Sequence, residues 1–220
     1  MDARIDGMLY AAIQHPPVLG SKVKTFDDKG PLQVKGVQKV IPLDTFNSAP
    51  AFQPLGGVAM VADNTWAAFQ GRKNLNATWE NSAHATYNSD EFKKELQETA
   101  RSTGHVVRNQ GDVDVEFAKG DKTIAAEYHA PHLAHVSMEP PVAVADVRDG
   151  KAVIWTSTQN PQAVQEVVAG QLGIPQSDVT CHVALLGGGF GRKSKPDYVA
   201  EAAIFSKKTG RPVKGVEPRR

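Results

Sequence analysis

A glycine-rich run from Leu185 to Lys193, with the sequence LLGGGFGRK, constrains the fold of this chain more than any other segment. Glycine has no Cβ, so it can adopt positive φ and lets successive backbone N–H groups approach a ligand. Arg192 and Lys193 at the end of the run add charged donors for an anion. We therefore predict a loop that holds an anionic group such as a phosphate.

The segments on either side of this loop support that prediction. Residues 178–186 predict a strand before it, and residues 197–207 predict a packed helix after it. In that order, the N–H groups of the loop and of the helix N-terminus point at the same anion. The run matches neither a Walker loop nor a dinucleotide-binding motif, so we do not expect a generic nucleotide site. A glycine-rich turn beside a basic surface is the alternative.

The composition is that of an ordinary globular protein, because 40% of the 220 residues are hydrophobic and 22% are charged. The formal net charge of +1 provides no field that would gather nucleic acid or an anionic membrane. The sequence has no run of about 18 apolar residues and no signal-peptide pattern at its start. We expect an α+β fold with two domains and no membrane-spanning segment.

The first half of the chain reads as a small α+β domain and a helical linker. Strands are predicted at residues 7–14, 34–41 and 58–62, and a helix at 66–77 follows the cap sequence DNT. Residues 82–88 are small and polar, and a second helix is predicted from residue 89 to about 104.

The second half alternates strands with helices around two strong local signals. Asp149 and Gly150 form a hairpin turn between the strands that we predict at 142–148 and 152–156. Asn160 and Pro161 start a helix that Gly173 ends. A further strand is predicted at 123–129.

Polar side chains follow the strand at 152–156, where they can project into a pocket. Gln159 could donate an N–H to an oxo or carbonyl oxygen. In the alternative interpretation, Thr158 or Asn160 simply caps the following helix. Both interpretations can hold together.

Metal ligands are scarce in this sequence. Cys181 is the single cysteine, so no internal disulfide or cysteine-built metal site is possible, and we expect it to be a buried strand residue. His132, His135 and Glu139 form a His-x-x-His-x-x-x-Glu pattern, but prolines at both ends oppose a helix that would gather them on one face. A metal site here ranks last among our hypotheses. We favour Glu139 as an acceptor for backbone N–H groups, or as part of a pocket wall.

Three motifs together resemble a known family. LAHVSMEP at 133–140, STQNPQ at 157–162 and GGGFGRK at 187–193, the last followed by DYVAEA at 197–202, occur in the order and spacing of the molybdenum-binding large subunit of the xanthine oxidase and aldehyde oxidoreductase family. Within that family, the chain is most similar to the beta subunit of isoquinoline 1-oxidoreductase and its aldehyde dehydrogenase-like bacterial relatives.

The resemblance implies a domain organisation and a cofactor. Residues 1–80 resemble the small α/β "hammerhead" domain, residues 81–105 a helical linker, and residues 106–220 the first part of the molybdopterin-binding α+β domain. The cofactor implied for the full-length enzyme is molybdopterin, often as the cytosine dinucleotide, and water supplies the oxygen with which substrate is hydroxylated. Gln159 matches the glutamine that hydrogen-bonds the apical oxo ligand of molybdenum. The other positions that match the cofactor-binding loop are Gly188, Gly189, Phe190, Gly191 and Arg192.

The resemblance also bears on substrate and partners. Arg192 and Ser194 differ from the glycine and glutamate of purine-oxidising members, so an aldehyde or an N-heterocycle is the expected substrate. The expected partners are the rest of the large subunit and a small subunit with [2Fe–2S] centres. The compartment is not determined by the sequence, because bacterial cytoplasm and periplasm both fit.

The catalytic glutamate of the family is missing from this chain. That base lies in a Gly-x-Gly-Glu motif far downstream in family members, and Glu217 lies in a segment that does not match it. We therefore expect an inactive fragment with no catalytic residue and no cofactor bound to the fragment itself. The alternative function is a stand-alone, non-enzymatic module that binds a phosphorylated ligand through residues 187–195.

Overall fold

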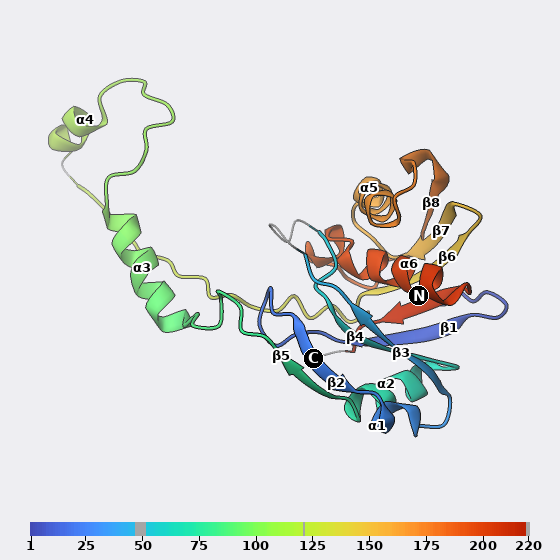
Figure 1. Ribbon diagram of the computed structural model, residues 1–220. Coiled ribbons are helices and arrows are strands. Elements are labelled where there is room, and N and C mark those ends of the chain that lie inside the picture. Colours follow the sequence, from blue (N-terminus) through green and yellow to red (C-terminus); the bar gives the residue numbers. More distant parts are fainter. Residues whose placement is uncertain (47–51, 121, 219–220) are drawn as a thin grey trace. The chain divides into compact units, whose positions relative to one another are not determined.

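The computed structural model describes residues 1–46, 52–120 and 122–218 (Figure 1). Within these residues, seven strands form one mixed sheet in the order β3-β4-β1-β9-β6-β7-β8, and two more form a separate ribbon, β2-β5. The strands are β1 (Leu9–Gln14), β2 (Val23–Asp27), β3 (Val37–Leu43), β4 (Gly57–Ala62), β5 (Asn76–Trp79), β6 (Val142–Arg148), β7 (Lys151–Thr156), β8 (Val179–Val183) and β9 (Val213–Val216). The helices are α1 (Lys29–Leu32), α2 (Thr65–Lys73), α3 (Ser89–Arg101), α4 (Val113–Lys119), α5 (Pro161–Leu172) and α6 (Asp197–Thr209), with 3₁₀ turns η1 (Gln176–Asp178) and η2 (Arg192–Ser194).

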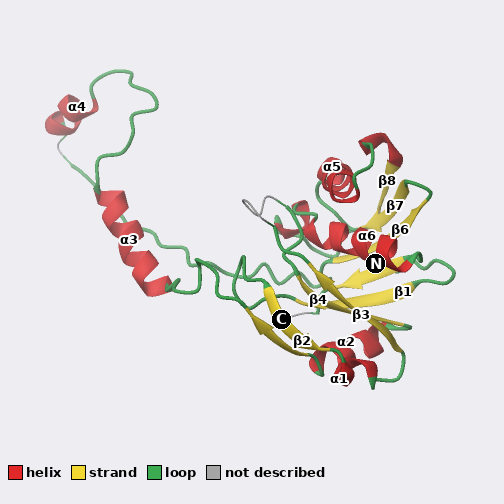
Figure 2. Ribbon diagram, in the orientation of Figure 1, coloured by secondary structure: helices red, strands yellow, loops and turns green. Residues whose placement is uncertain are grey.

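The middle of the large sheet joins segments from both ends of the sequence. Strand β1 pairs antiparallel with β4 and parallel with β9, where Leu9 lies opposite Val213. Strand β9 also pairs antiparallel with β6. The early strands and the late strands therefore share one hydrogen-bonded sheet (Figure 2).

Alternation along β1 places helices on opposite faces of this sheet. Leu9, Ala11 and Ile13 pack with Phe205 of α6, whereas Ala12 packs with Ala67 of α2. Side chains at odd and even positions of a strand point to opposite faces, so α6 and α2 cover different faces. On the α6 side, α5 adds Val164 and Val168 to a second apolar cluster around β6 and β7.

Local signals fix the helix ends that the sequence predicted. The side chain of Asn64 accepts from the amide of Ala67 at the start of α2, and that of Asn160 accepts from Ala163 at the start of α5. These caps satisfy N–H groups that have no partner within the helix. The predicted helices α3, α5 and α6 and the predicted strands β1, β4, β6 and β7 are confirmed, as is the α+β class.

The structure contains two compact units, which are described separately. The first comprises residues 1–85 and 135–220, and the second residues 86–134. In the second unit, the ring of Tyr87 stacks on His132, Phe92 is tilted against both, and Glu127 accepts from Gln97 and Arg101. The compact units thus do not follow the division at residues 80 and 105, and the domain boundaries stay a prediction.

Several elements differ from the sequence prediction, and α1 and α4 are among those that it did not include. The strand at 123–129 is wrong, because these residues form no strand and lie exposed in a unit whose regular elements are helices. The ribbon β2-β5 was not predicted, and Asn76, where β5 begins, lies inside the segment expected to continue α2. Strand β8 ends at Val183 rather than at residue 186, so the glycine loop begins earlier.

Among the described helices, none is long and apolar enough to cross a membrane.

Candidate functional site

Two neighbouring parallel strands deliver the predicted site residues to one edge of the sheet. Strands β7 and β8 are parallel, with Thr156 opposite Val183 at their carboxyl ends. Gln159 follows β7, and the glycine loop follows β8. Carboxyl ends of adjacent parallel strands meet at one edge, which is where ligands bind in many sheets with helices on their faces. The structure therefore brings the two predicted segments together.

The carboxamide of Gln159 is held by the loop in a defined orientation. Its Oε1 accepts a hydrogen bond from the amide of Gly191 at 3.0 Å, and its backbone N–H donates to the carbonyl of Lys193 at 3.1 Å. The amide of Gly191 donates, so the carboxamide atom that faces it must be the acceptor oxygen Oε1. The Nε2 atom of Gln159 therefore keeps both of its protons for another acceptor. Gln159 is exposed, so this donor can reach a ligand.

Two loop glycines are required by close contacts. A Cβ on Gly189 would lie 2.4 Å from Oε1 of Gln159, and a Cβ on Gly187 would lie 2.5 Å from Cβ of Glu139. Both distances are far below van der Waals contact. The loop backbone can therefore lie against Gln159 and Glu139 only where residues 187 and 189 have no side chain.

The residues between these contacts present unbonded amides. Phe190 adopts φ of +52°, an uncommon conformation for a bulky residue, and its side chain is 72% exposed. Among the described residues, the amides of Gly188, Gly189 and Phe190 find no hydrogen-bond acceptor. Successive free N–H groups in such a loop can receive an anionic or strongly polar atom. Backbone strain of this kind is typical of ligand-binding loops.

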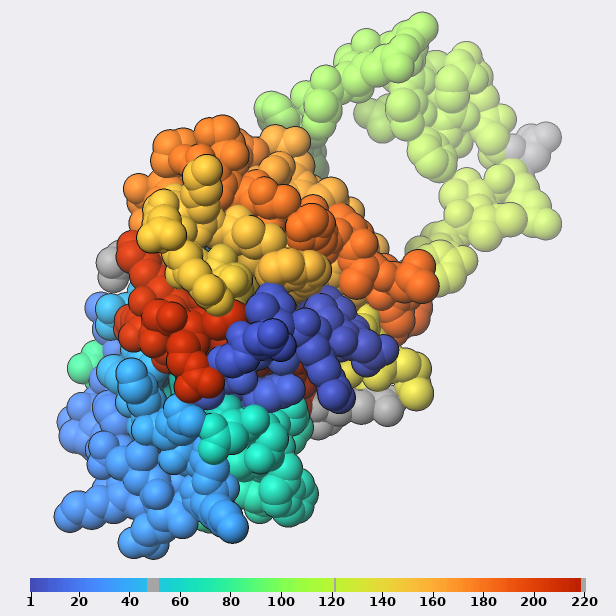
Figure 3. All heavy atoms as spheres, turned by 90° about the vertical axis from the view of Figure 1, so that its right-hand side faces the viewer, coloured from blue at the N-terminus to red at the C-terminus, as the bar shows by residue number. Residues whose placement is uncertain are grey.

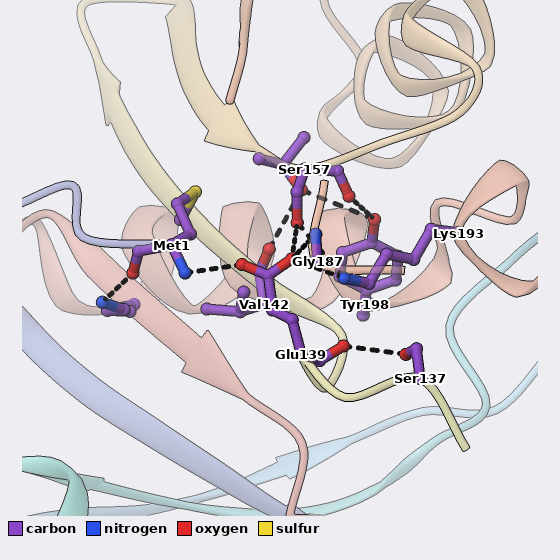
Figure 4. A network of polar contacts seen from close by, with 10 residues as sticks. Met1, Ser137, Glu139, Val142, Ser157, Gly187, Lys193 and Tyr198 are labelled. Atoms are coloured by element: carbon purple, nitrogen blue, oxygen red, sulfur yellow. Dashed lines mark hydrogen bonds and ion pairs between the residues drawn. The ribbon is translucent and has the colours of Figure 1, made fainter. Parts of the chain in front are cut away.

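Both carboxylate oxygens of Glu139 accept hydrogen bonds, and Oε2 anchors the start of the loop (Figure 4). Oε2 accepts from the ammonium group of Lys193 at 2.6 Å, from the hydroxyl of Ser157 at 2.7 Å and from the amide of Gly187 at 3.1 Å. Oε1 accepts from the amino group of Met1 at 2.6 Å. The bond from Gly187 agrees with the interpretation of Glu139 as an acceptor for backbone N–H groups.

Electrostatics keep this carboxylate ionised. Burial alone would raise the pKa of Glu139, but hydrogen bonds from Lys193, the Met1 amino group, Ser157 and Gly187 lower that pKa to about 2. The side chain of Lys193 is fully buried. The expectation that Lys193 donates to a bound anion is therefore wrong, because its charge is used to hold Glu139 beneath the loop.

Arg192 is also paired within the chain. Its guanidinium makes two hydrogen bonds to the carboxylate of Asp197, at 2.8 and 3.0 Å, and lies 3.4 Å from Oε1 of Glu217. Burial lowers the pKa of Arg192, but the charge and hydrogen bonds of Asp197 outweigh burial and raise it. In the described part of the chain, donors that remain for a ligand at this edge include the loop amides and Nε2 of Gln159.

An open groove of about 690 Å³ borders the first residue of the loop. Its walls are the first three residues, Glu139, Trp155 and residues 182–187. The rings of Trp155 and His182 stack there with centroids 5.3 Å apart. Figure 3 shows the N-terminal residues, in blue, packed on this face against the orange and red segments of the second half of the chain.

The remaining candidate residues are not gathered into a site. His132 stacks on Tyr87, and His132, His135 and Glu139 do not form a ligand group among the described residues. Cys181 lies on β8 as predicted, but it is half-buried instead of buried, and partial burial raises the pKa of its thiol. Sequence reasoning missed the pairing of Lys193 with Glu139 and of Arg192 with Asp197.

Comparisons with known proteins identify the family of this chain. The model of the molybdopterin cofactor-binding domain family matches residues 96–220. Isoquinoline 1-oxidoreductase subunit beta from Brevundimonas diminuta is 32% identical over 97% of this chain and 27% of its own length. A membrane-bound aldehyde dehydrogenase from Gluconacetobacter polyoxogenes is 31% identical over 97% of this chain and 28% of its own length.

Solved structures show the same fold. Quinoline 2-oxidoreductase from Pseudomonas putida 86 superimposes with a TM-score of 0.71 at 20% identity, covering 99% of this chain and 32% of that chain. Aldehyde oxidoreductase from Desulfovibrio gigas gives a TM-score of 0.71 at 21% identity, covering 97% and 27%. The chain thus spans about a quarter to a third of the length of these proteins. It belongs to the molybdopterin cofactor-binding domain family of the molybdenum hydroxylases.

Proposed function

We propose that this chain forms one wall of the molybdopterin site in a molybdenum hydroxylase that oxidises an aldehyde or an N-heterocycle. The observation that carries the proposal is the contact between Gln159 and the glycine loop, which sets one side-chain donor beside three amides that find no acceptor among the described residues. When bound, molybdopterin supplies the metal centre at which substrate is hydroxylated with oxygen from water. The cytosine dinucleotide is the form that we propose.

Each loop residue has a definite task in this proposal. Gly188, Gly189 and Phe190 offer backbone N–H groups to polar atoms of the cofactor, and Nε2 of Gln159 offers a further donor. Gly191 fixes the orientation of the Gln159 carboxamide. Arg192 contributes as the residue that closes the loop, because its amide donates to the carbonyl of Gly189 at 2.9 Å. Preorganised donors cost little reorganisation when charge develops on a ligand.

The proposal leaves the proton-accepting step to the rest of the protein. Glu139 is held by three side-chain or terminal donors at an apparent pKa of about 2, so it is a poor base near neutral pH. We propose that the base, the remaining cofactor contacts and the [2Fe–2S] partner lie in chain segments and subunits outside residues 1–220. On this proposal, these residues alone turn over no substrate and retain no cofactor.

Substrate class follows from the residues beside the loop. Ser194 donates its hydroxyl to the carbonyl of Gly191 at 2.6 Å and therefore braces the loop instead of contacting a heterocycle as a glutamate would. The groove beside Gly187 is lined partly by apolar residues, including Leu185 and Leu186. Both features support an aldehyde or an apolar N-heterocycle over a purine. Product analysis of the complete enzyme with these three substrate classes tests this choice.

The variant Gln159→Glu tests the proposed donor. A glutamate can still accept from the amide of Gly191, but it replaces the N–H₂ donor toward the cofactor with a carboxylate oxygen and adds one negative charge. We expect kcat of the complete enzyme to fall about 10- to 100-fold while molybdenum content stays near that of the parent. Gln171→Glu, on the exposed face of α5, should leave both unchanged. An active Gln159→Glu enzyme would refute the proposed role.

Gly189→Ala tests the fit of the loop. The added methyl group would displace the Gln159 carboxamide, because it would lie 2.4 Å from Oε1. We expect molybdenum content to fall at least about tenfold, with a smaller loss of stability, since a flexible side chain can move away. Gly170→Ala is the matched control, because its Cβ would meet no atom within 4 Å. Full molybdenum loading of Gly189→Ala would contradict the proposed geometry.

The stand-alone phosphate-binding module receives no support from these observations. Two of the three cations in residues 187–195, Arg192 and Lys193, are paired with Asp197 and Glu139. The comparisons likewise match enzyme subunits.

A further inference from the structure

A second cluster of titratable side chains lies where three elements of the first unit meet, and the proposed function does not use it. His15 follows β1, Glu201 lies on α6 and Glu217 follows β9. One potential ligand atom from each residue lies within 4.8 Å of the others. Among the described residues, this is the one group of three or more histidine, cysteine or acidic side chains arranged in this way.

The hydrogen bond of His15 orients its ring toward the two glutamates. Nδ1 lies 2.9 Å from the carbonyl oxygen of Gly56, and a carbonyl can only accept, so Nδ1 carries a proton. In the neutral ring, Nε2 then presents its lone pair. Nε2 faces Oε2 of Glu201 at 3.8 Å, which is too long for a hydrogen bond. Two electron-rich atoms facing each other in this way require a cation or a proton between them.

Glu201 supplies an independent observation. Its side chain is 3% exposed, and Oε1 finds no hydrogen-bond partner among the described residues. A buried carboxylate oxygen without a partner is costly unless a cation balances it. The same carboxylate points into the cluster with His15 and Glu217.

Three carboxyl groups and one guanidinium lie at the cluster. Asp197, Glu201 and Glu217 carry three negative charges when ionised, and the guanidinium of Arg192 returns one positive charge. A cavity of about 10 Å³ lies beside Glu201, Glu217 and Tyr198 and is just large enough for one water molecule. One imidazole nitrogen, two carboxyl groups and space for a water suit a divalent cation.

We propose that His15, Glu201 and Glu217 bind one divalent transition-metal ion, with Zn²⁺ as the best-suited probe and a water as the fourth ligand. One imidazole and two carboxylates form a ligand set that zinc accepts. The bond from Nδ1 to a backbone carbonyl is the usual outer-shell support of a zinc-binding histidine. Two zinc bonds of about 2.0–2.1 Å span up to about 4.2 Å, so the 3.8 Å between Nε2 and Oε2 leaves room for the ion.

The bound ion would clamp the sheet near its centre. Strands β1 and β9 are parallel neighbours, and α6 lies immediately before β9 in the chain. A metal held by the residues after β1 and β9 and by α6 therefore ties three segments that are far apart in sequence. The inferred role is structural and independent of molybdopterin.

Zinc uptake by the complete protein tests this inference. Chelator-treated protein, equilibrated with Zn²⁺ and washed, should retain one more zinc per chain than Glu217→Gln or His15→Gln protein. X-ray absorption at the zinc edge should show only nitrogen and oxygen ligands with one imidazole, a signal that neither iron nor molybdenum obscures. The affinity for Zn²⁺ should fall at least about tenfold in each variant. His84→Gln, an exposed histidine of the same unit, is the control.

Two outcomes would overturn the inference. Equal zinc content in parent and variants would show that uptake occurs elsewhere, and no uptake by the parent would show that protons balance the cluster. The side chain of Glu201 is only 3% exposed, so Glu201→Gln is the variant at greatest risk of misfolding. Glu217 keeps 26% of its side chain exposed, so Glu217→Gln carries the test.

Discussion

Replacing Glu139 with alanine is expected to destabilise the protein by about 3 to 5 kcal/mol near neutral pH. The reason is Lys193, whose fully buried ammonium group would lose its carboxylate partner at 2.6 Å. Removing one member of a buried ion pair leaves an uncompensated charge, which costs more than the pair itself contributes. Urea unfolding of the complete protein at pH 7 measures the change, with Glu166→Ala on the exposed face of α5 as the control.

A double variant and a pH series separate this effect from lost packing. Glu139→Gln with Lys193→Met removes both charges and should recover much of the loss. The pKa of Glu139 is about 2 in the folded state and 4.5 for an unperturbed glutamate, so its stabilisation is complete above pH 4.5 and is lost as the pH falls toward 2. That contribution amounts to about 3 kcal/mol. A loss below about 1 kcal/mol in Glu139→Ala, or one that does not shrink in acid, would contradict the prediction.

Elements with local signals were predictable from the sequence. The hairpin β6-β7 follows from the turn at Asp149 and Gly150, and α5 follows from Asn160 and Pro161. In each case, a few neighbouring residues determine the backbone conformation. The meeting of Gln159 with the glycine loop was predictable from the family resemblance, and the parallel pairing of β7 and β8 gives its physical reason.

Elements that depend on distant partners were not predictable. Alternation at residues 123–129 suggested a strand, but a strand forms only where an edge is available for pairing, and these residues have none. The pairing of β1 with β9 joins residues about two hundred positions apart. The ion pair of Lys193 with Glu139 likewise spans 54 positions, so the basic end of the loop looked available to a ligand.

Arg192 shows how one position can support two interpretations. From its place after the glycines, the sequence predicts a cofactor contact. In the structure, its guanidinium is bidentate to Asp197, the first residue of α6. The sequence did contain a signal for this pairing. Asp197 begins a predicted helix five positions after Arg192, and an acidic residue in that place can reach back to the guanidinium. The two interpretations predict different behaviour when the guanidinium is replaced.

The variant Arg192→Met should destabilise the protein by about 3 kcal/mol or more. Burial and the charges of Asp197 and Glu217 already raise the pKa of Glu201 well above its usual range, and Arg192 opposes that repulsion. Without the guanidinium, three carboxyl groups face one another in a largely buried region. Arg192→Lys should recover part of the loss, because an ammonium group restores the charge but cannot form the bidentate pair.

A surface ion pair as control and a measurement of bound molybdenum distinguish a structural role of Arg192 from a direct contact with the cofactor. Arg148 pairs with Asp146 at 2.7 Å, but its side chain is 56% exposed, so Arg148→Met should cost less than about 1 kcal/mol. Chemical unfolding of the complete enzyme compares the two. If Arg192 acts through the loop, the folded Arg192→Lys enzyme should retain most of its molybdenum. Loss of molybdenum from Arg192→Lys with parental stability would instead show that the guanidinium contacts the cofactor directly.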